Sequence, residues 1–525
     1  MMTEQGYTTQ GMQHHAVILV EDSGPSSFSW AKLAKFFGPG LLMCIAYVDP
    51  GNLESDLQTG ATTGYTLLWL LLVTTMMGFL VQMQAAKLGV VTGKNLAEMC
   101  RAEYPRPAAY LLWIMAEFAI IGSDVQEVIG SAIALSLLSW GRIPLWAGAL
   151  LSAVASFAML LIERAGIRKL EALFAVLIAT MVASFGVMFA RAGVPTSEVA
   201  SGFLIPNLPQ QDIATAVALF GSLIMPHNIY LHSALVQNRN LVPSVRDKRE
   251  AMDYFRIESG ASLVASLVIN LFVVSVFATG FYRPDQPPPD IGLKNAGEFL
   301  GASFGEVSVY VWGLGLLAAG QSSTMTGTYT GQFVMSGFLD LKVSPWARIV
   351  VTRAVALVPT MAVALAMDPA STQLDKLNQG LNLLQSIQLP FALIPVLTFT
   401  GSKRIMGNMA NGTLHAASCW AVSMLVIAIN LTAIKEVAES FSHRVLVILG
   451  AGMAAYFGFI MYLLVNGVSS RLKERHCQLS ANVSEGGYQA LPDSAPQEDE
   501  QDRQPQQQKQ GVQQQGMTQR AGEGQ

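Results

Sequence analysis

The sequence predicts an all-α membrane protein with about twelve transmembrane helices. The chain has 525 residues, of which 51% are hydrophobic and 13% are charged, whereas about 25% of the residues in a soluble domain are charged. Apolar stretches that are long enough to cross a bilayer, about 20 helical residues each, recur from Phe37 to Val465. Two of them are interrupted by a proline beside polar side chains. The net charge of −4 gives no basic face for nucleic acid, which we do not expect as a partner.

The apolar stretches divide the chain into three parts. Residues 1–36 form a polar N-terminal segment without a cleavable signal peptide, residues 37–466 form the transmembrane domain, and residues 467–525 form a tail. The expected spans are 37–60, 64–88, 108–138, 144–162, 170–190, 210–238, 257–281, 305–334, 347–367, 376–400, 413–433 and 444–466.

Lys and Arg are distributed unevenly over the connections between these spans. The connections after even-numbered spans hold sixteen of them, and those after odd-numbered spans hold seven. Because basic residues accumulate on the cytoplasmic side of a membrane, both termini are expected in the cytosol. The sequence leaves open whether the membrane is the plasma membrane or an endosomal, lysosomal or vacuolar membrane.

The tail after Gly467 is polar and rich in Gln. Such a composition cannot bury a core, so we expect a disordered cytoplasmic tail. Its segment Tyr488-Gln-Ala-Leu491 fits the tyrosine-based pattern that endocytic sorting adaptors bind. An inert tail is the alternative interpretation, because such short patterns also arise by chance.

The first span contains a helix break at Asp49-Pro50-Gly51-Asn52. Pro-Gly in the middle of a membrane helix frees backbone groups that lipid cannot satisfy, so they must face protein or a water-filled cavity. An aspartate near the membrane centre costs about 2.5–3.5 kcal/mol on insertion scales. Asp49 is therefore predicted to belong to a functional site.

The sixth span repeats this feature at Met225-Pro226-His227, a few residues after Ser222. Each broken helix is the first of a five-helix block, over about 37–190 and about 210–400, and two further helices follow over about 413–466. Paired broken helices indicate an inverted-repeat transporter whose substrate binds where the repeats meet. The substrate is thus expected between Asp49 and Met225.

The side chains at the two breaks indicate the substrate. Asp49 and Asn52 offer oxygen ligands, the break at Ser222 offers a backbone carbonyl, and Met225 offers a thioether. This mixture suits Mn²⁺, Fe²⁺, Co²⁺ or Cd²⁺ better than Ca²⁺ or Mg²⁺, which prefer oxygen alone. The alternative for Met225 is packing, since the chain has 24 methionines and most methionines fill gaps in cores.

Four motifs in this order resemble the Nramp family of metal-ion transporters. They are Asp49-Pro-Gly-Asn52, Met225-Pro-His227, the segment Gly320–Gln332 and the segment Leu384–Ala392. The resemblance extends from about Phe37 to Val465. It implies the leucine-transporter fold, with two inverted five-helix repeats and two C-terminal helices, and proton-coupled uptake toward the cytosol.

The resemblance also implies a ligand set. The family's metal ligands correspond to the side chains of Asp49, Asn52 and Met225, the backbone carbonyl of Ser222, and Gln385 in the occluded state. Ser222 departs from the family pattern, which usually has Ala or Cys, and we expect this change to alter local polarity without abolishing binding. The neighbouring amides Asn378, Asn382 and Gln388 are expected to form hydrogen bonds between helices.

Three carboxyls in the third span suggest a proton path. Glu117, Asp124 and Glu127 are spaced by seven and three residues, so they lie along one face of a helix. Three ionised carboxyls on one face of a membrane helix are costly, and at least one is expected to exchange protons near neutral pH. The alternative is a buried structural cluster paired with Arg353. The resemblance assigns Asp124, Glu127 and Arg353 to the family's proton-exit network.

The two histidines of the sixth span are further candidates. His227 directly follows the break and titrates in a range suited to a switch, so a proton-linked or gating role is favoured over metal ligation, with packing as the structural alternative. His232 lies about 140° further around the helix and remains a candidate for the proton path.

We expect a transporter, and neither an enzyme nor a protein with a resident cofactor: the metal is the transported substrate and H⁺ the coupling ion. Two other functions stay open at this point. One is a sodium-coupled amino-acid or amine symporter of the same fold. The other is a metal-responsive membrane sensor, which should carry a folded output domain.

Overall fold

Residues 18–19, 28–164, 167–240, 244–286, 291–339, 373–439, 450 and 452–467 are described in the computed structural model, together with isolated positions between 351 and 365. Most of the predicted ninth span lies outside the described residues, as do Arg353 and the segment Tyr488–Leu491.

The first half of the described chain is helical apart from one short strand. A two-residue strand β1 (Ile18–Leu19) precedes the helices. These are α1 (Trp30–Phe36), α2 (Pro39–Ala46), α3 (Pro50–Thr63), α4 (Leu68–Thr92), α5 (Leu96–Glu103), α6 (Arg106–Leu138), α7 (Leu145–Arg164), α8 (Ile167–Ala192) and α9 (Thr196–Leu204).

The second half repeats this pattern. The short strand β2 (Arg239–Asn240) pairs in parallel with β1. The helices are α10 (Ile213–Leu223), α11 (Pro226–Leu235), α12 (Val245–Phe281), α13 (Leu293–Phe304), α14 (Val307–Leu339), α16 (Gln373–Thr400), α17 (Lys403–Met406), α18 (Thr413–Glu439) and a last helix Gly452–Gly467, with 3-10 turns η1 (Gln210–Asp212), η2 (Val236–Asn238) and η3 (Gly407–Met409).

Seven helical segments of the described chain are long and apolar enough to cross a membrane. They are Leu68–Thr92, Arg106–Leu138, Arg168–Ala192, Gln210–Asn238, Val245–Phe281, Leu374–Thr400 and Thr413–Thr432. The first predicted span, which its break divides into α2 and α3, is not among them. α14 has 33 residues, but its Gly, Ser and Thr residues lower its hydropathy. The segment Leu145–Ala155 of α7 and the last helix, Gly452–Gly467, are apolar as well.

One predicted span begins at the wrong place. The seventh was expected over 257–281, but α12 begins at Val245. The apolar pattern marks only the part of this helix that suits lipid, whereas the charged residues before it continue the same helix.

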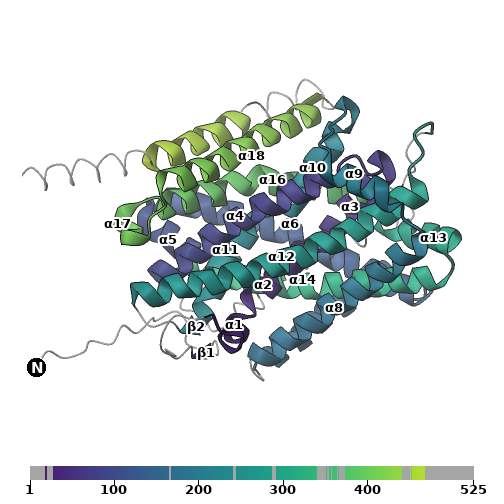
Figure 1. The fold of residues 1–525 in the computed structure, drawn as a ribbon, viewed down its shortest axis with the longest axis horizontal. Coiled ribbons are helices and arrows are strands. Elements are labelled where there is room, and N and C mark those ends of the chain that lie inside the picture. Colours follow the sequence, from purple (N-terminus) through teal and green to yellow (C-terminus); the bar gives the residue numbers. More distant parts are fainter. Residues whose placement is uncertain are drawn as a thin grey trace, which may run out of the picture. The chain divides into compact units, whose positions relative to one another are not determined.

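The helices pack so that the two breaks lie inside the bundle. α14 runs along α6 and α8, and α12 runs along α3 and α4, while α18 lies beside α16 at one edge (Figure 1). Gly130 of α6 makes a close approach possible, because a Cβ atom there would collide with the ring of Pro50. A glycine at this position therefore lets α6 pack directly against the first break.

Candidate functional site

The first break lies between α2 and α3. Asp49 caps α3: its Oδ1 accepts a hydrogen bond of 2.8 Å from the backbone N–H of Asn52, as expected for an aspartate before a helix that begins with proline. Pro50 has no N–H, so the carbonyl of Ala46 loses the donor that a continuous helix would supply. The break thus places a buried carboxylate, only 2% exposed, beside freed backbone groups.

The second break lies between α10 and α11 and has the same cause. Met225 precedes α11 in an extended conformation, and Pro226 is the first helical residue. Because Pro226 lies four residues after Ser222, it removes the helical donor for the Ser222 carbonyl. The Ser222 hydroxyl donates to the carbonyl of Leu219 at 2.9 Å. The group that Ser222 offers at the break is therefore its backbone carbonyl.

Side chains from the second repeat bind the first break. Nδ2 of Asn228 donates to the carbonyl of Ala46 at 3.3 Å, and Nδ2 of Asn270 donates to the carbonyl of Tyr47 at 3.1 Å. α10 also packs against α3. The two broken helices are thus neighbours. The first break is stabilised by the side-chain amides of Asn228 and Asn270, which the sequence patterns did not predict as partners of the break.

The donors at the breaks are buried. Met225 is 1% exposed, and the side-chain oxygen and nitrogen of Asn52 are buried with no hydrogen-bond partner among the residues that the structure describes. A buried amide without partners is costly, which is consistent with a group kept for a ligand. No group of three or more His, Cys, Asp and Glu residues suited to a metal occurs in the described part of the chain. The donor set here is mixed instead: carboxylate, amide, carbonyl and thioether.

α16 and α6 cover this region with a chain of amides. Nδ2 of Asn382 donates to the carbonyl of Gly51 at 3.3 Å and to Oγ of Ser55 at 2.9 Å. Gln126 donates to Oδ1 of Asn382 at 2.8 Å and accepts from Nε2 of Gln385 at 3.0 Å. The prediction of hydrogen bonding between helices is confirmed for Asn382. Gln385 lies in the same network, and its buried Oε1 has no partner in the described part of the chain.

The predicted carboxyls of α6 lie at different depths. Asp124 and Glu127 are buried and both face Gly327 of α14, where a Cβ atom would crowd them. Oε1 of Glu127 accepts from the hydroxyl of Ser123 at 2.8 Å. Glu117 is half-buried, accepts from Nε1 of Trp113 at 2.8 Å, and is near enough to Asp124 for an electrostatic interaction. The three carboxyls therefore share one side of α6, as the spacing predicts.

The two histidines have different surroundings. His227 is 2% exposed, and no other described residue forms a hydrogen bond with its Nδ1. Nδ1 of His232 lies 2.6 Å from Oε1 of Gln82 on α4. Both rings lie in α11, next to the second break. His232 is thus tied to α4 through Nδ1, and each ring keeps one buried nitrogen without a partner among the described residues, Nδ1 in His227 and Nε2 in His232.

Two acidic residues of α3 were missed by the sequence reasoning. Glu54 accepts from the backbone N–H of Leu293 at 2.9 Å and so anchors the first turn of α13. Asp56 is fully buried, and neither of its carboxyl oxygens has a hydrogen-bond partner within the described ranges. Their sequence position could have indicated them, because both are acidic residues in the first predicted membrane span, which also contains Asp49.

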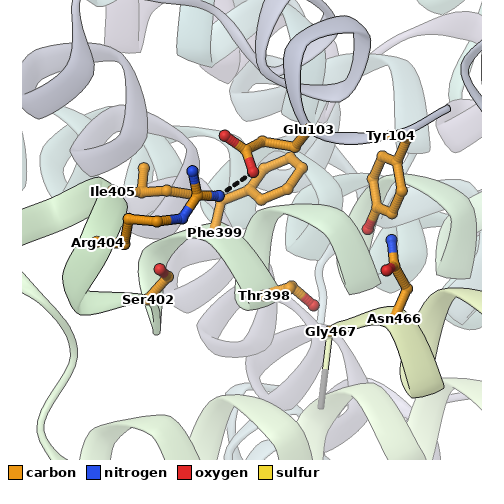
Figure 2. Close-up of a pocket in the computed structure, with 9 residues that line it drawn as sticks. All are labelled: Glu103, Tyr104, Thr398, Phe399, Ser402, Arg404, Ile405, Asn466 and Gly467. Carbon is orange, nitrogen blue, oxygen red and sulfur yellow. Dashed lines mark hydrogen bonds and ion pairs between the residues drawn. The ribbon is translucent and has the colours of Figure 1, made fainter. Parts of the chain in front are cut away.

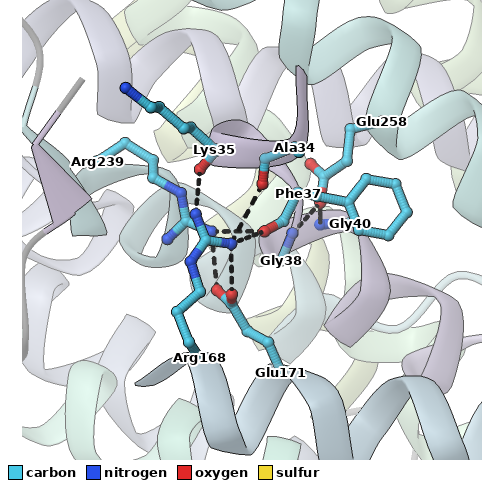
Figure 3. Close-up of polar contacts among 9 residues, drawn as sticks. All are labelled: Ala34, Lys35, Phe37, Gly38, Gly40, Arg168, Glu171, Arg239 and Glu258. Carbon is cyan, nitrogen blue, oxygen red and sulfur yellow. Dashed lines mark hydrogen bonds and ion pairs between the residues drawn. The ribbon is translucent and has the colours of Figure 1, made fainter. Parts of the chain in front are cut away.

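A charged network closes the end of the bundle where α1 joins α2, and we call it the clasp (Figure 3). It consists of Arg168, Glu171, Arg239 and Glu258. Nη2 of Arg239 donates to Oε1 of Glu171 at 2.7 Å and to the carbonyl of Phe37 at 2.8 Å. The clasp thus links α8 and β2 to the segment that precedes α2.

Glu258 of α12 holds the start of α2 directly. Its Oε1 accepts from the backbone N–H groups of Gly38 and Gly40 at 2.6 and 2.7 Å, a favourable position for a carboxylate at a helix N-terminus. Gly38 has φ 151°, and a Cβ atom there would collide with Glu171. Only glycine fits at this junction. The sequence reasoning had treated the basic residues of the clasp as loop charges.

We expect Glu171→Gln to destabilise the protein. The side chain of Arg239 is 0% exposed, and removing one partner of a buried ion pair costs about 3–5 kcal/mol. The thermal unfolding temperature of the purified protein should therefore fall. Asp253→Asn is the control, because the Arg256–Asp253 pair is exposed and should contribute less than about 1 kcal/mol. Equal unfolding temperatures for E171Q and the parent would contradict a stabilising clasp.

A small pocket of about 20 Å³ lies away from the breaks, between α5, α16, α17 and the last helix (Figure 2). Arg404 and Glu103 form an ion pair at its rim. Tyr104 lines it, and burial raises the pKa of this phenol well above its ordinary value, so the hydroxyl is neutral. The pocket has room for a water molecule at most and none of the donors predicted for the substrate.

Fold and site together define a class of protein. Two broken helices, each opening one repeat of a multi-pass membrane bundle and facing each other at a buried polar site, are the architecture of a secondary transporter. Residues 40–436 match the family described as Nramp, natural resistance-associated macrophage protein-like. The chain belongs to the Nramp family.

The relatives agree with this membership. Metal transporter Nramp3 of Arabidopsis thaliana is 51% identical over 460 residues, which cover 85% of this chain and 89% of that protein. Metal transporter Nramp6 of Oryza sativa subsp. japonica is 51% identical over 451 residues, which cover 85% of this chain and 83% of that protein.

Solved structures agree on the fold. A crystal structure of the Eremococcus coleocola manganese transporter, in complex with an aromatic bis-isothiourea substituted compound, has a TM-score of 0.76 and 27% identity, covering 89% of this chain and 99% of that chain. Mhp1, a nucleobase-cation-symport-1 family transporter, has a TM-score of 0.51 and 16% identity, covering 78% of this chain and 94% of that chain, and shares the fold alone. The predicted all-α fold of the leucine-transporter type is confirmed.

Proposed function

We propose that this protein is a proton-coupled secondary transporter that carries divalent transition-metal ions, chiefly Mn²⁺ and Fe²⁺ and also Co²⁺ or Cd²⁺, toward the cytosol. One observation carries the proposal: a buried carboxylate and a buried thioether lie at two neighbouring helix breaks, Asp49 at the first and Met225 at the second. Membership of a family whose relatives are named metal transporters supports it.

The ligand set follows from the chemistry of the donors. Asp49 supplies the negative charge, Asn52 an amide oxygen, Met225 a soft sulfur and Ser222 its freed backbone carbonyl. Gln385 approaches from α16, and its Oε1 has no hydrogen-bond partner in the described structure of the chain. A thioether interacts better with transition metals than with Ca²⁺ or Mg²⁺, so sulfur provides the selectivity and oxygen provides most of the coordination.

Protons are proposed to use a separate route along α6. Glu117, Asp124 and Glu127 lie on one side of that helix. His227 lies next to the break, and its Nδ1 has no partner among the described side chains and backbone groups. A proton relay needs groups that can change charge inside the membrane, and carboxyls and imidazoles are such groups. His232 and Arg353 are the remaining members of the proposed route.

Alternating access requires that the two ends of the bundle open in turn. At one end α2 is held by the clasp. At the other end Glu54 attaches α3 to α13. We propose that release toward the cytosol breaks the clasp and lets α2 move away, because α2 is the half-helix between that end and Asp49.

Orientation and location complete the proposal. The distribution of basic residues supports cytosolic termini. The membrane is the plasma membrane or an endosomal, lysosomal or vacuolar membrane, and Tyr488–Leu491 is proposed as the point where a sorting adaptor binds.

Flux into proteoliposomes made with the purified full-length protein tests this function. A metal-sensitive dye inside should respond to external Mn²⁺ and Fe²⁺ far more than to Ca²⁺ or Mg²⁺, and an inward proton gradient should accelerate the response. Metal binding without flux would instead favour a sensor. Inhibition of the metal flux by amino acids together with a dependence on Na⁺ would favour the symporter.

A further inference from the structure

A surface groove of about 420 Å³ lies where α12 begins, apart from the transport site. Arg246 and Arg249 of α12 contribute guanidinium groups to its lining. Phe28, Tyr254 and Ile257 contribute aromatic and aliphatic surface, and two acidic residues, Glu250 and Asp253, complete the lining. The groove thus combines exposed guanidinium groups with aromatic and aliphatic surface.

The groove is positively charged after its own ion pairs are counted. Its two acidic residues already have basic partners: Glu250 pairs with Lys32 at 2.6 Å, and Asp253 pairs with Arg256 at 2.6 Å. Arg246 and Arg249 are exposed, and no ion pair with another described residue involves either of them. They also lie in the first turns of a 37-residue helix, where the helix dipole favours an anion. The groove therefore has two guanidinium groups available for an anionic partner.

The exposed face of α12 changes from polar to apolar along the groove. Arg246, Arg249 and Asp253 are followed on the same face by Ile257 and Val264, which are 46% and 59% exposed. The aromatic residues Trp30 and Phe28 are also exposed near this transition, 77% and 52% respectively. Exposed aromatic residues are typical of a membrane–water interface. The groove therefore extends from the level of the lipid headgroups to that of the acyl chains.

We infer that this groove binds an anionic phospholipid of the adjoining leaflet. The headgroup phosphate binds Arg246 and Arg249 through charge-assisted hydrogen bonds, and an acyl chain lies along Ile257 and Val264. A free phosphate ion would use only the arginines. The continuous apolar surface below them favours a lipid as the occupant.

The lipid would also act on α1. This helix is attached to α12 by the Lys32–Glu250 ion pair. In addition, the backbone N–H of Ser29 donates a hydrogen bond of 3.0 Å to the Tyr254 hydroxyl, and the rings of Phe36 and Tyr254 stack with their centroids 5.1 Å apart. α1 leads directly into the junction that the clasp holds. A lipid that contacts both Phe28 and α12 therefore strengthens the attachment of α1 to α12, next to the junction that the clasp holds.

Binding of phosphatidylserine with short acyl chains and a fluorescent label to the purified full-length protein in detergent tests the inference. The double variant Arg246→Gln and Arg249→Gln should bind about 30-fold more weakly, since each basic residue near a membrane surface contributes about 1 kcal/mol. Phosphatidylcholine with the same chains should bind more weakly than phosphatidylserine. The matched control replaces two exposed arginines of other connections, Arg142→Gln and Arg283→Gln, and should bind like the parent.

Three results would overturn the inference. The first is equal binding by the double variant and the parent, and the second is equal binding of the two lipids. The third is that inorganic phosphate displaces the labelled lipid at the same concentration as unlabelled phosphatidylserine does. If the double variant fails to fold, which its thermal unfolding would reveal, Arg249→Gln alone is compared with Arg142→Gln in the same assay. Because the readout is binding, it does not depend on whether the protein transports metal.

Discussion

Asp49→Asn is expected to lower Mn²⁺ uptake by up to about 100-fold. The substitution keeps the size of the side chain and an oxygen that can still cap α3, but it removes the only negative charge in the proposed ligand set. Charge-assisted contacts contribute about 1.5–3 kcal/mol, and a loss near the upper end of this range corresponds to a factor of about 100. Uptake is measured in proteoliposomes at metal concentrations well below saturation.

The control for this variant is Glu198→Gln. Glu198 is an exposed carboxylate of α9, so its neutralisation changes the net charge equally without touching the broken helices, and uptake should equal that of the parent. Normal uptake by D49N, with intact folding, would remove the metal site from the first break.

Met225→Ala is expected to change which ions are carried. Loss of the thioether should preserve much of the Mn²⁺ flux while Ca²⁺ or Mg²⁺ begins to enter, because the remaining donors are all oxygens, which hard cations prefer. Met225→Leu keeps most of the volume and removes only the sulfur, so it should show the same change with a smaller loss of stability. Competition of Ca²⁺ and Mg²⁺ against Mn²⁺ in the flux assay measures the effect.

Met181→Ala separates sulfur chemistry from packing. Met181 of α8 is 0% exposed and lies in the apolar core, so its truncation should destabilise the protein by about 2–5 kcal/mol without changing ion selectivity. If M225A and M225L retained the parent's selectivity, Met225 would be a packing residue like Met181.

Much of the fold could be read from local patterns. Apolar length predicted most of the spans in their order, since a helix in lipid must satisfy its backbone hydrogen bonds by itself. The prolines at positions 50 and 226 predicted both breaks, because a missing N–H acts wherever the helix packs. The apolar pattern did not predict the start of α12, because the helix already begins at Val245, before the apolar residues of the expected span.

The sequence by itself determined the residues that carry the chemistry: Asp49, Asn52 and Met225 lie at the breaks because proline and its neighbours shape the backbone locally. Only the tertiary structure decided which groups meet them. Asn228 binds the carbonyl of Ala46 across 182 positions, and Gln126 and Gln385 pair across 259. The clasp likewise joins residues from three separate elements, α8, β2 and α12. Such partners depend on how whole helices pack and at what register, and a hydrogen bond between distant segments leaves no periodic trace in either of them.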